Sequence, residues 1–395
     1  MRRLGIPRRT AALTGANSLS AAVQGQFQFV LPWMLLTRGH SPQVAALAAG
    51  LVYAPLLLTA FPAGATSDNA DPRRLMRIAT VVTLVACALY PVAALAGYDS
   101  FGLVLVAAVV VGSVRNFSEG ALFRGIGDTT RGTALLRAHA VRTTVNQAAV
   151  FGSPFVGLLL FRIGGAVAVM IGICALLVAA VAVLALVPEL ERESQPAAVM
   201  RANVTDGIAS LRANSRLRKI AWANMTWCIF AGAAIGIMPA VLREHLGMNE
   251  VRASATFVAG AVVVVVLTLP VVRASLHRVG ANSTFVIAIT IQGISVLLFA
   301  DPRAAIVGPL IYCLFLLSNS AAAASLNGAR AAEVEHDHQG LLNMALLTVG
   351  MIGFILGVVA AAVLLGPLGF GVVLAVIGVG MTATAIGFRR PLAVV

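Results

Sequence analysis

The sequence predicts an all-α membrane protein with twelve transmembrane helices in two six-helix pseudo-repeats. Three observations predict this fold: an apolar composition, apolar runs long enough to cross a bilayer, and a polar stretch near the middle of the chain. The mean hydropathy is +0.93, and of 395 residues 59% are apolar and only 11% are charged. Soluble domains are about 25% charged, so this chain has too little charge to cover a surface that faces water.

Twelve apolar runs have the length of membrane-spanning helices. A span needs about 20 mostly apolar residues, and lipid requires each backbone polar group to be paired within the helix. A membrane barrel would need alternating polar and apolar residues, whereas Ala261–Leu267 is continuously apolar. The predicted spans are residues 11–36, 42–65, 76–97, 101–123, 134–160, 164–187, 219–242, 251–272, 283–300, 304–327, 340–365 and 367–388.

Positive charges gather in short clusters between these runs. The net charge of +13 would suggest nucleic acid in a soluble protein. With the amino terminus inside, however, 21 Arg and Lys residues lie on the inner side and 5 on the outer side. This asymmetry predicts a multi-pass protein of a bacterial inner membrane with both termini in the cytoplasm and no nucleic-acid partner.

The longest polar stretch marks the predicted boundary between the halves. It separates an N-terminal six-helix half at residues 1–187 and a C-terminal six-helix half at 219–395 from a cytoplasmic central loop at 188–218. Repeated halves are a common plan of secondary transporters.

Neither a cofactor nor a metal is expected. The four cysteines fall singly inside apolar runs, and the loop Glu333–His338 lacks the spacing of a standard metal site. The chain has no Gly-x-x-x-x-Gly-Lys-Ser/Thr motif for ATP and no evident nucleophile–base arrangement, so we do not expect an enzyme. A membrane sensor, or an enzyme using residues 333–338, is the non-transporting alternative.

A polar motif follows the second predicted span. It reads Gly64-Ala-Thr-Ser-Asp68-Asn-Ala-Asp-Pro-Arg73-Arg74 and resembles the signature loop of the major facilitator superfamily. Asn69 and Asp71 depart from the family pattern. The resemblance implies the major facilitator fold and secondary transport. We interpret Gly64, Asp68, Arg73 and Arg74 as a conformational latch, although the arginines alone would also serve to hold topology.

The fifth span carries Gly152-Ser-Pro154-Phe-Val-Gly157, with Ser153 and Leu158 as departures from the Gly-Pro-x-x-Gly-Gly element of the superfamily's exporters. Gly152, Pro154 and Gly157 are expected to bend the helix and to allow close packing. The chain resembles the branch of enterobactin-type siderophore exporters and macrolide efflux proteins. This resemblance implies an antiporter that exports a drug, siderophore or secondary metabolite in exchange for protons. Proton-coupled uptake of a nutrient is the alternative.

Ionisable residues are rare in the predicted spans, and those present are candidates for function because charge is costly in a membrane. Arg115 and Glu119 lie one turn apart on one face of span four. Glu119 is either a proton site controlled by Arg115 or half of a static ion pair, and Asp68 is the second proton-site candidate. On span five, Arg142 binds an anionic substrate group or pairs with Glu119, and His139 is able to titrate near neutral pH.

Further polar side chains mark a possible substrate cavity. In the superfamily, spans one, four, seven and ten line the transport path, and span one carries a polar face here. The alternative is hydrogen bonding between helices. The expected partners are a small-molecule substrate, protons and the lipid bilayer, with the protein as a monomer. The cavity candidates are Asn17, Gln24, Gln28, Arg142, Asn146, Asn224, Trp227, Ser318 and Asn319.

Overall fold

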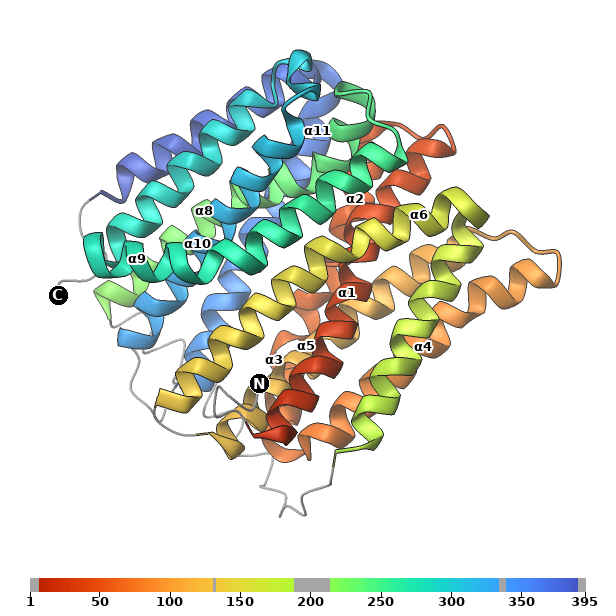
Figure 1. The fold of residues 1–395 in the computed structure, drawn as a ribbon, viewed down its shortest axis with the longest axis horizontal. Helices are drawn as coiled ribbons and strands as arrows, with labels where there is room; N and C mark the ends of the chain where they lie inside the picture. The colour runs from red at the N-terminus through yellow and green to blue at the C-terminus, as the bar shows by residue number, and fades with distance from the viewer. Residues whose placement is uncertain (1–6, 131–132, 188–213, 334–338, 390–395) are drawn as a thin grey trace. The chain divides into compact units, whose positions relative to one another are not determined.

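The computed structural model is helical and contains no strand in the residues it describes, which are 7–130, 133–187, 214–333 and 339–389 (Figure 1). Most of the predicted central loop, at 188–213, lies outside these ranges, as do residues 334–338 of the loop Glu333–His338.

The helices form two compact units. Unit 1 comprises Met1–Val30 and Leu51–Pro196, and unit 2 comprises Leu31–Gly50 and Ala197–Val395. The first helix therefore begins in unit 1 and ends in unit 2. Compactness does not measure whether two segments repeat one another, so the two six-helix halves stay a prediction.

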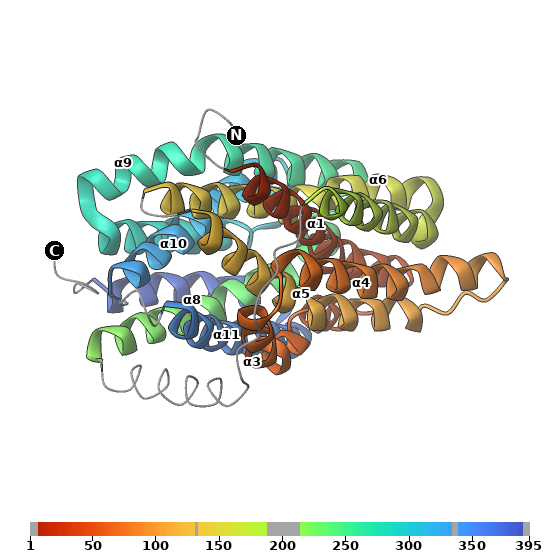
Figure 2. The ribbon, with the colours of Figure 1, turned by 90° about the horizontal axis from the view of Figure 1, so that it is seen from below.

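Unit 1 is built from helices that pack in neighbouring pairs. Figure 2 shows α4 beside α5, and these two helices are in contact. The long helix α6 is broken at Gly164 and Gly165, where Gly165 has a φ of 61° that only glycine adopts readily. The unit contains most of α1 (Arg8–Thr37) and the whole of four later helices. These are α3 (Ala54–Asn69), α4 (Pro72–Leu95), α5 (Gly102–Thr129) and α6 (Thr133–Ala185).

Unit 2 repeats this paired packing, with α8 against α11 and α9 against α10. Two of its long helices also turn at a glycine, at Gly280 with φ of 79° and at Gly369 with φ of 72°. The unit contains most of α2 (Pro42–Leu51) and the whole of the later elements. These are α8 (Ser215–Ala240), the π-helical turn η2 (Val241–His245), α9 (Glu250–Leu298), η3 (Pro302–Ala305), α10 (Gly308–Glu333) and α11 (Gln339–Gly387).

The predicted twelve-span fold is confirmed. Within the described residues, nine helical segments are long and apolar enough to cross a membrane, and two of them, Val141–Ala185 and Leu346–Gly387, have the length of two crossings. When each helix broken at a glycine is counted as two rods, and α2 and α3 as one span, the helices match the twelve predicted spans. The helix α1 is outside the nine because the polar residues along it, such as Asn17, Gln24 and Gln28, lower its hydropathy.

Large apolar side chains lie exposed on many of these helices. Examples are Leu58, Ile163 and Val363. A soluble protein rarely exposes so many apolar side chains, because water disfavours contact with them. Lipid removes this penalty, as expected for a multi-pass membrane protein.

Candidate functional site

The ionisable residues predicted on spans four and five meet around a single carboxylate in unit 1. Arg115 and Glu119 lie on one face of α5, and Arg142 approaches from α6. The Nη2 of Arg115 donates to the Oε1 of Glu119, and the Nη1 of Arg142 donates to its Oε2. Each carboxylate oxygen therefore accepts a hydrogen bond from one guanidinium. Pairing with Glu119 was one of the two predictions for Arg142.

Three neutral side chains hold the rest of the Arg115 guanidinium. Its Nη1 donates to the Oδ1 of Asn17 at 2.7 Å and its Nε donates to the Oε1 of Gln24 at 3.0 Å. Its Nη2 also lies 3.3 Å from the Oδ1 of Asn146. All three nitrogens of Arg115 therefore have acceptors, supplied by α1, α5 and α6, and the side chain ties these three helices together.

The carboxylate is the most accessible charged group of the three. The side chain of Arg115 is 5% exposed and that of Arg142 is 13% exposed, against 22% for Glu119. The amide nitrogens of Asn17 and Asn146 each lie 3.4 Å from the Oε1 of Glu119. We call Asn17, Gln24, Arg115, Glu119, Arg142 and Asn146 the charged cluster.

Arg142 has a different environment from Arg115. The centre of its guanidinium lies 4.0 Å above the ring of Phe123 on α5, which is a cation–π contact. Its Nε is buried and has no hydrogen-bond partner. The first arginine is therefore fully engaged by protein groups, whereas the second keeps an unused donor.

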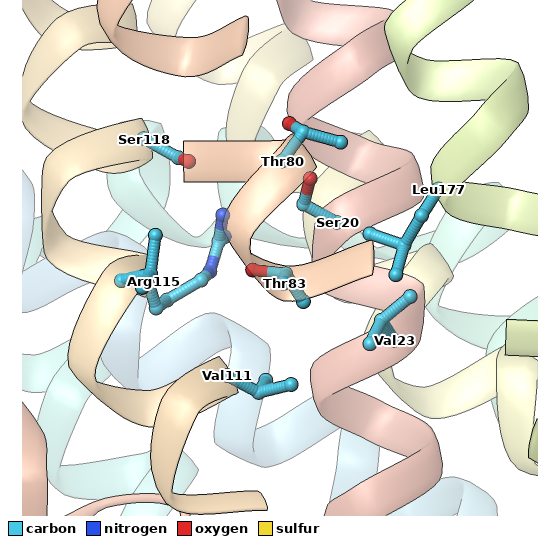
Figure 3. Close-up of a pocket in the computed structure, with 9 residues that line it drawn as sticks. Ser20, Val23, Thr80, Thr83, Val111, Arg115, Ser118 and Leu177 are labelled. Atoms are coloured by element: carbon cyan, nitrogen blue, oxygen red, sulfur yellow. The ribbon is translucent and has the colours of Figure 1, made fainter. Parts of the chain in front are cut away.

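A small cavity adjoins Arg115, and neither Glu119 nor Arg142 lines it. Its volume is about 10 Å³, close to the space that one water molecule needs. Figure 3 shows the Arg115 guanidinium extending toward the wall formed by Ser20 and Thr83. Besides Arg115, the lining residues are Ser20, Val23, Thr80, Thr83, Val111, Val114, Ser118 and Leu177.

Gln28 lies one turn beyond Gln24 on α1 and belongs to a separate hydrogen bond. The hydroxyl of Tyr53 donates to its Oε1 at 2.5 Å, and both side chains are buried. Tyr53 sits where α2 ends and α3 begins with Pro55 at its first turn. Tyr53 was not among the predicted residues, although a tyrosine in an apolar span needs a partner for its hydroxyl.

Two of the predicted polar residues of unit 2, Trp227 and Asn319, belong to a neutral network. The Nε1 of Trp227 donates to the Oε1 of Gln292 at 2.9 Å, and the Nε2 of Gln292 donates to the Oδ1 of Asn319 at 3.0 Å. Ser318 bonds to carbonyls of its own helix, at Leu314 and Phe315. Gln292 was not among the predicted residues, and its only signal was a lone glutamine inside an apolar span.

Asn224 of the same unit packs between helices. Its Nδ2 donates to the carbonyl oxygen of Leu346 at 2.9 Å. A Cβ on Gly350 would approach this amide too closely, so α8 and α11 lie in close contact here. Asn224, Trp227 and Asn319 therefore all make hydrogen bonds between helices.

The motif after the second span is only partly described. The side chain of Asp68 lies outside the described residues, as does that of His139 on α6. Gly64 is half-buried on α3, and Arg74 is exposed. Arg73 donates from Nε to the carbonyl oxygen of Leu184 at 2.9 Å, and so caps the end of α6.

Asp71, which departs from the family motif, has two roles. Its Oδ2 accepts from the backbone nitrogen of Arg74 at 3.1 Å as the cap of α4, and its Oδ1 pairs with Arg9 at 3.1 Å. The signal in the sequence was an aspartate directly before Pro72, a typical start of a helix.

The span-five motif lies where α6 packs against α1. A Cβ on Gly157 would overlap the side chains of Gln26 and Val30. The Ser153 hydroxyl donates to the carbonyl oxygen of Ala22 at 2.8 Å, and the Nε2 of Gln26 donates to the carbonyl oxygen of Ser153 at 3.1 Å. Gly152 is half-buried, and Pro154 lies inside α6 with its ring buried.

In the described ranges, no group of three or more His, Cys, Asp and Glu side chains is arranged to hold a metal ion.

Comparison with known proteins identifies the family of this fold. The family model described as Major Facilitator Superfamily matches residues 13–357. No curated protein matches the sequence.

Solved structures of transporters have the same fold. A variant of the nucleoside transporter NupG is 13% identical, with a TM-score of 0.73 over 96% of this chain and 99% of that chain. The human organic anion transporter MFSD10 (TETRAN) is 15% identical, with a TM-score of 0.71 over 97% of this chain and 99% of that one. At these identities the likeness shows the fold alone.

Proposed function

Because the chain belongs to the major facilitator superfamily, we propose that it is a proton-coupled secondary transporter that moves a small amphipathic organic molecule by alternating access. The chain is a transporter and not an enzyme. The observation that carries the proposal is the Glu119 carboxylate, which lies between two guanidinium groups inside a membrane-spanning bundle.

Glu119 is the proposed proton site. Without a proton, it accepts from Arg115 on α5 and from Arg142 on α6 and draws the two helices together. A proton on the carboxylate removes the charge that both arginines share, and the two guanidinium groups then repel each other. Protonation therefore changes the relative stability of two packings of α5 and α6, which is the requirement for coupling to a conformational change.

The membrane potential supplies the driving force. One proton crossing the membrane contributes ~2.3 kcal/mol per 100 mV, enough to shift a conformational equilibrium about fortyfold. Asp68 remains the second candidate for the proton site. The residues Gly64, Asp68, Arg73 and Arg74 remain the proposed cytoplasmic latch.

The first candidate for direction is efflux of a drug, siderophore or secondary metabolite in exchange for protons. It is supported by the span-five element, whose Gly157 lets α6 pack closely on α1. The second candidate is proton-coupled uptake. It is supported by the two arginines that share the single carboxylate of Glu119, because their surplus positive charge favours an anion that enters together with a proton. The protein is proposed to act as a monomer in a bacterial inner membrane, with both termini in the cytoplasm.

Transport into inside-out vesicles tests the proton site. An acid interior drives accumulation of a panel of fluorescent cations and siderophore-like ligands if the protein is an exporter that exchanges protons. Glu119→Gln is expected to abolish the dependence on the gradient, because an amide cannot take up the proton. Right-side-out vesicles with an acid exterior test uptake in the same way.

A matched control comes from the same helix. Asp128 lies on α5 and pairs with Arg124 at 3.5 Å, outside the charged cluster. Asp128→Asn makes the same chemical change and is expected to leave gradient-driven transport in place. Gradient-driven transport that survives Glu119→Gln would move the proton site to another residue, with Asp68→Asn as the next variant.

A further inference from the structure

The charged cluster carries one positive charge more than its acidic group balances. Arg115 and Arg142 contribute two guanidinium groups, and Glu119 contributes a single carboxylate. A buried charge without a counter-charge is costly in a membrane protein. Every other acidic side chain described in unit 1 has a partner elsewhere: Asp71 pairs with Arg9, Asp128 with Arg124, and Asp99 accepts from Tyr90.

The unused hydrogen-bonding capacity belongs to Arg142. The three nitrogens of Arg115 all donate to protein acceptors, whereas the buried Nε of Arg142 has none. Its Nη1 is occupied by Glu119. The hydrogens on Nε and Nη2 of a guanidinium point along one edge and match the two oxygens of a carboxylate or phosphate. The free edge of Arg142 therefore has the geometry of an oxyanion ligand.

An aromatic ring lies directly against this arginine. Phe123 covers one face of the guanidinium at 4.0 Å, and its side chain is 40% exposed. Stacking uses the face of the guanidinium and leaves its edge free for hydrogen bonds. Arg142 and Phe123 together present a cationic edge beside an apolar surface.

We propose that the charged cluster binds the oxyanion of an amphipathic organic anion, with Arg142 as its direct ligand and Phe123 against its apolar body. The substrate class is thus an organic molecule with a carboxylate, sulfonate or phosphate next to an apolar or aromatic group. Anion binding rests on the charges and contacts of the cluster, and only its coupling to protons rests on the proposed function.

The coupling has a definite sign. A proton on Glu119 raises the charge of the cluster from one to two positive charges, so it strengthens attraction to an anion. By reciprocity, a bound anion strengthens proton binding by the same factor. A proton and an anion that favour each other travel together, so an anionic substrate selects uptake over exchange as the direction of transport.

Binding to matched ligand pairs tests this inference without transport. The full chain in phosphatidylcholine nanodiscs is titrated with 2-naphthoate and 2-naphthamide, naphthalenesulfonate and its sulfonamide, and naphthyl phosphate and naphthol. The expected result is that at least one anion binds about tenfold or more tightly than its neutral analogue, as a charge-assisted hydrogen bond provides. Equal affinity within all three pairs overturns the proposal.

Variants locate the site. Arg142→Gln is expected to weaken the preferred anion about tenfold or more without changing its neutral analogue, and Arg142→Lys is expected to retain part of the preference. Arg124→Gln is the matched control, because this arginine on α5 is 45% exposed and pairs with Asp128. Undiminished anion preference in folded Arg142→Gln protein overturns the assignment.

Two further binding measurements test the coupling to protons and a lipid as the source of the anion. Glu119→Gln is expected to bind the anion more tightly at neutral pH and to lose the pH dependence of binding. If it binds anions as the wild type does at every pH, the coupling fails while anion binding stands. Nanodiscs with phosphatidylglycerol test a lipid source: competition by this lipid that depends on Arg142 would replace the substrate proposal with a lipid site.

Discussion

The two units solve the problem of polar groups in a membrane in different ways. In unit 1, Arg115, Glu119 and Arg142 form a charged cluster whose carboxylate is partly accessible. In unit 2, the buried side chains of Trp227, Gln292 and Asn319 form a chain of neutral hydrogen bonds. The first arrangement changes its charge when a proton binds, whereas the second keeps the same charge at any physiological pH.

This difference separates two roles that polar residues have inside membranes. A neutral hydrogen bond between membrane helices contributes only about 0.6 kcal/mol on average, so the unit 2 network stabilises packing modestly and without dependence on pH. A charged pair makes a larger difference to stability when one partner changes. We infer that the proposed proton chemistry belongs to the charged cluster and that the neutral network positions α8, α9 and α10.

The largest loss of stability is expected for Arg115→Leu. This change removes four hydrogen bonds that join α1, α5 and α6 and leaves the acceptors of Asn17 and Gln24 without their donor. The expected destabilisation is about 3 kcal/mol, because hydrogen bonds from a charged donor are lost and buried acceptors are left unpaired. It is measured by thermal unfolding of the purified protein in detergent. A loss below about 1 kcal/mol, comparable to that expected in the neutral network, would remove the energetic distinction between the two units.

The next largest loss of stability is expected where helices pack closely, and it differs between the two units. A Cβ on Gly357 would overlap the backbone of α8 at Ile229, which cannot move aside, whereas a Cβ on Gly157 would meet the flexible side chain of Gln26. We expect Gly357→Ala to cost about 2–3 kcal/mol and Gly157→Ala less. Chemical or thermal unfolding of both variants gives the order, and the reverse order would contradict this explanation.

A smaller effect is expected for Gln292→Leu in the neutral network. The change removes the hydrogen bonds to Trp227 and Asn319, and two such bonds contribute about 1 kcal/mol in membrane proteins. The pH dependence of transport is expected to match that of the wild type, because no charge is altered. A shifted pH profile, measured in the same vesicles as Glu119→Gln, would show that the neutral network takes part in coupling.

The smallest effect is expected for Asp71→Asn at the start of α4. The amide oxygen still caps the helix at Arg74, and only the ion pair with Arg9 is lost. The expected cost is about 0.5 kcal/mol, reduced further at high salt. Asp71→Ala removes the cap as well and is expected to cost about 1 kcal/mol more, so unfolding of both variants separates the two contributions.

Much of the fold follows from local sequence. The helices begin close to the starts of the predicted spans, because a run of about 20 apolar residues in lipid has few structures other than a helix. Some run further than predicted, since α5 ends at Thr129 and α10 at Glu333. The breaks inside α6, α9 and α11 fall at Gly165, Gly280 and Gly369, where the sequence already changes from one span to the next. The polar face of α1 was evident from helical spacing, as was the pairing of Arg115 with Glu119.

The partners of the candidate residues were less predictable. Arg142 and Glu119 are 23 residues apart and lie on different helices, so their pairing depends on how α5 and α6 pack. Gln292 was overlooked because a single amide in an apolar span carries no pattern of its own. Its role becomes evident only beside the indole of Trp227 and the amide of Asn319.

The sequence by itself determined the membrane spans and which polar residues share a helix face, because these depend on interactions within a few turns of one chain segment. Only the tertiary structure decided that two arginines share one carboxylate, that Arg142 keeps an unused donor beside Phe123, and that unit 2 carries a neutral network. These features depend on packing between helices, where small residues such as Gly157 and Gly357 set the distance of approach. Hydropathy along the chain does not encode that geometry.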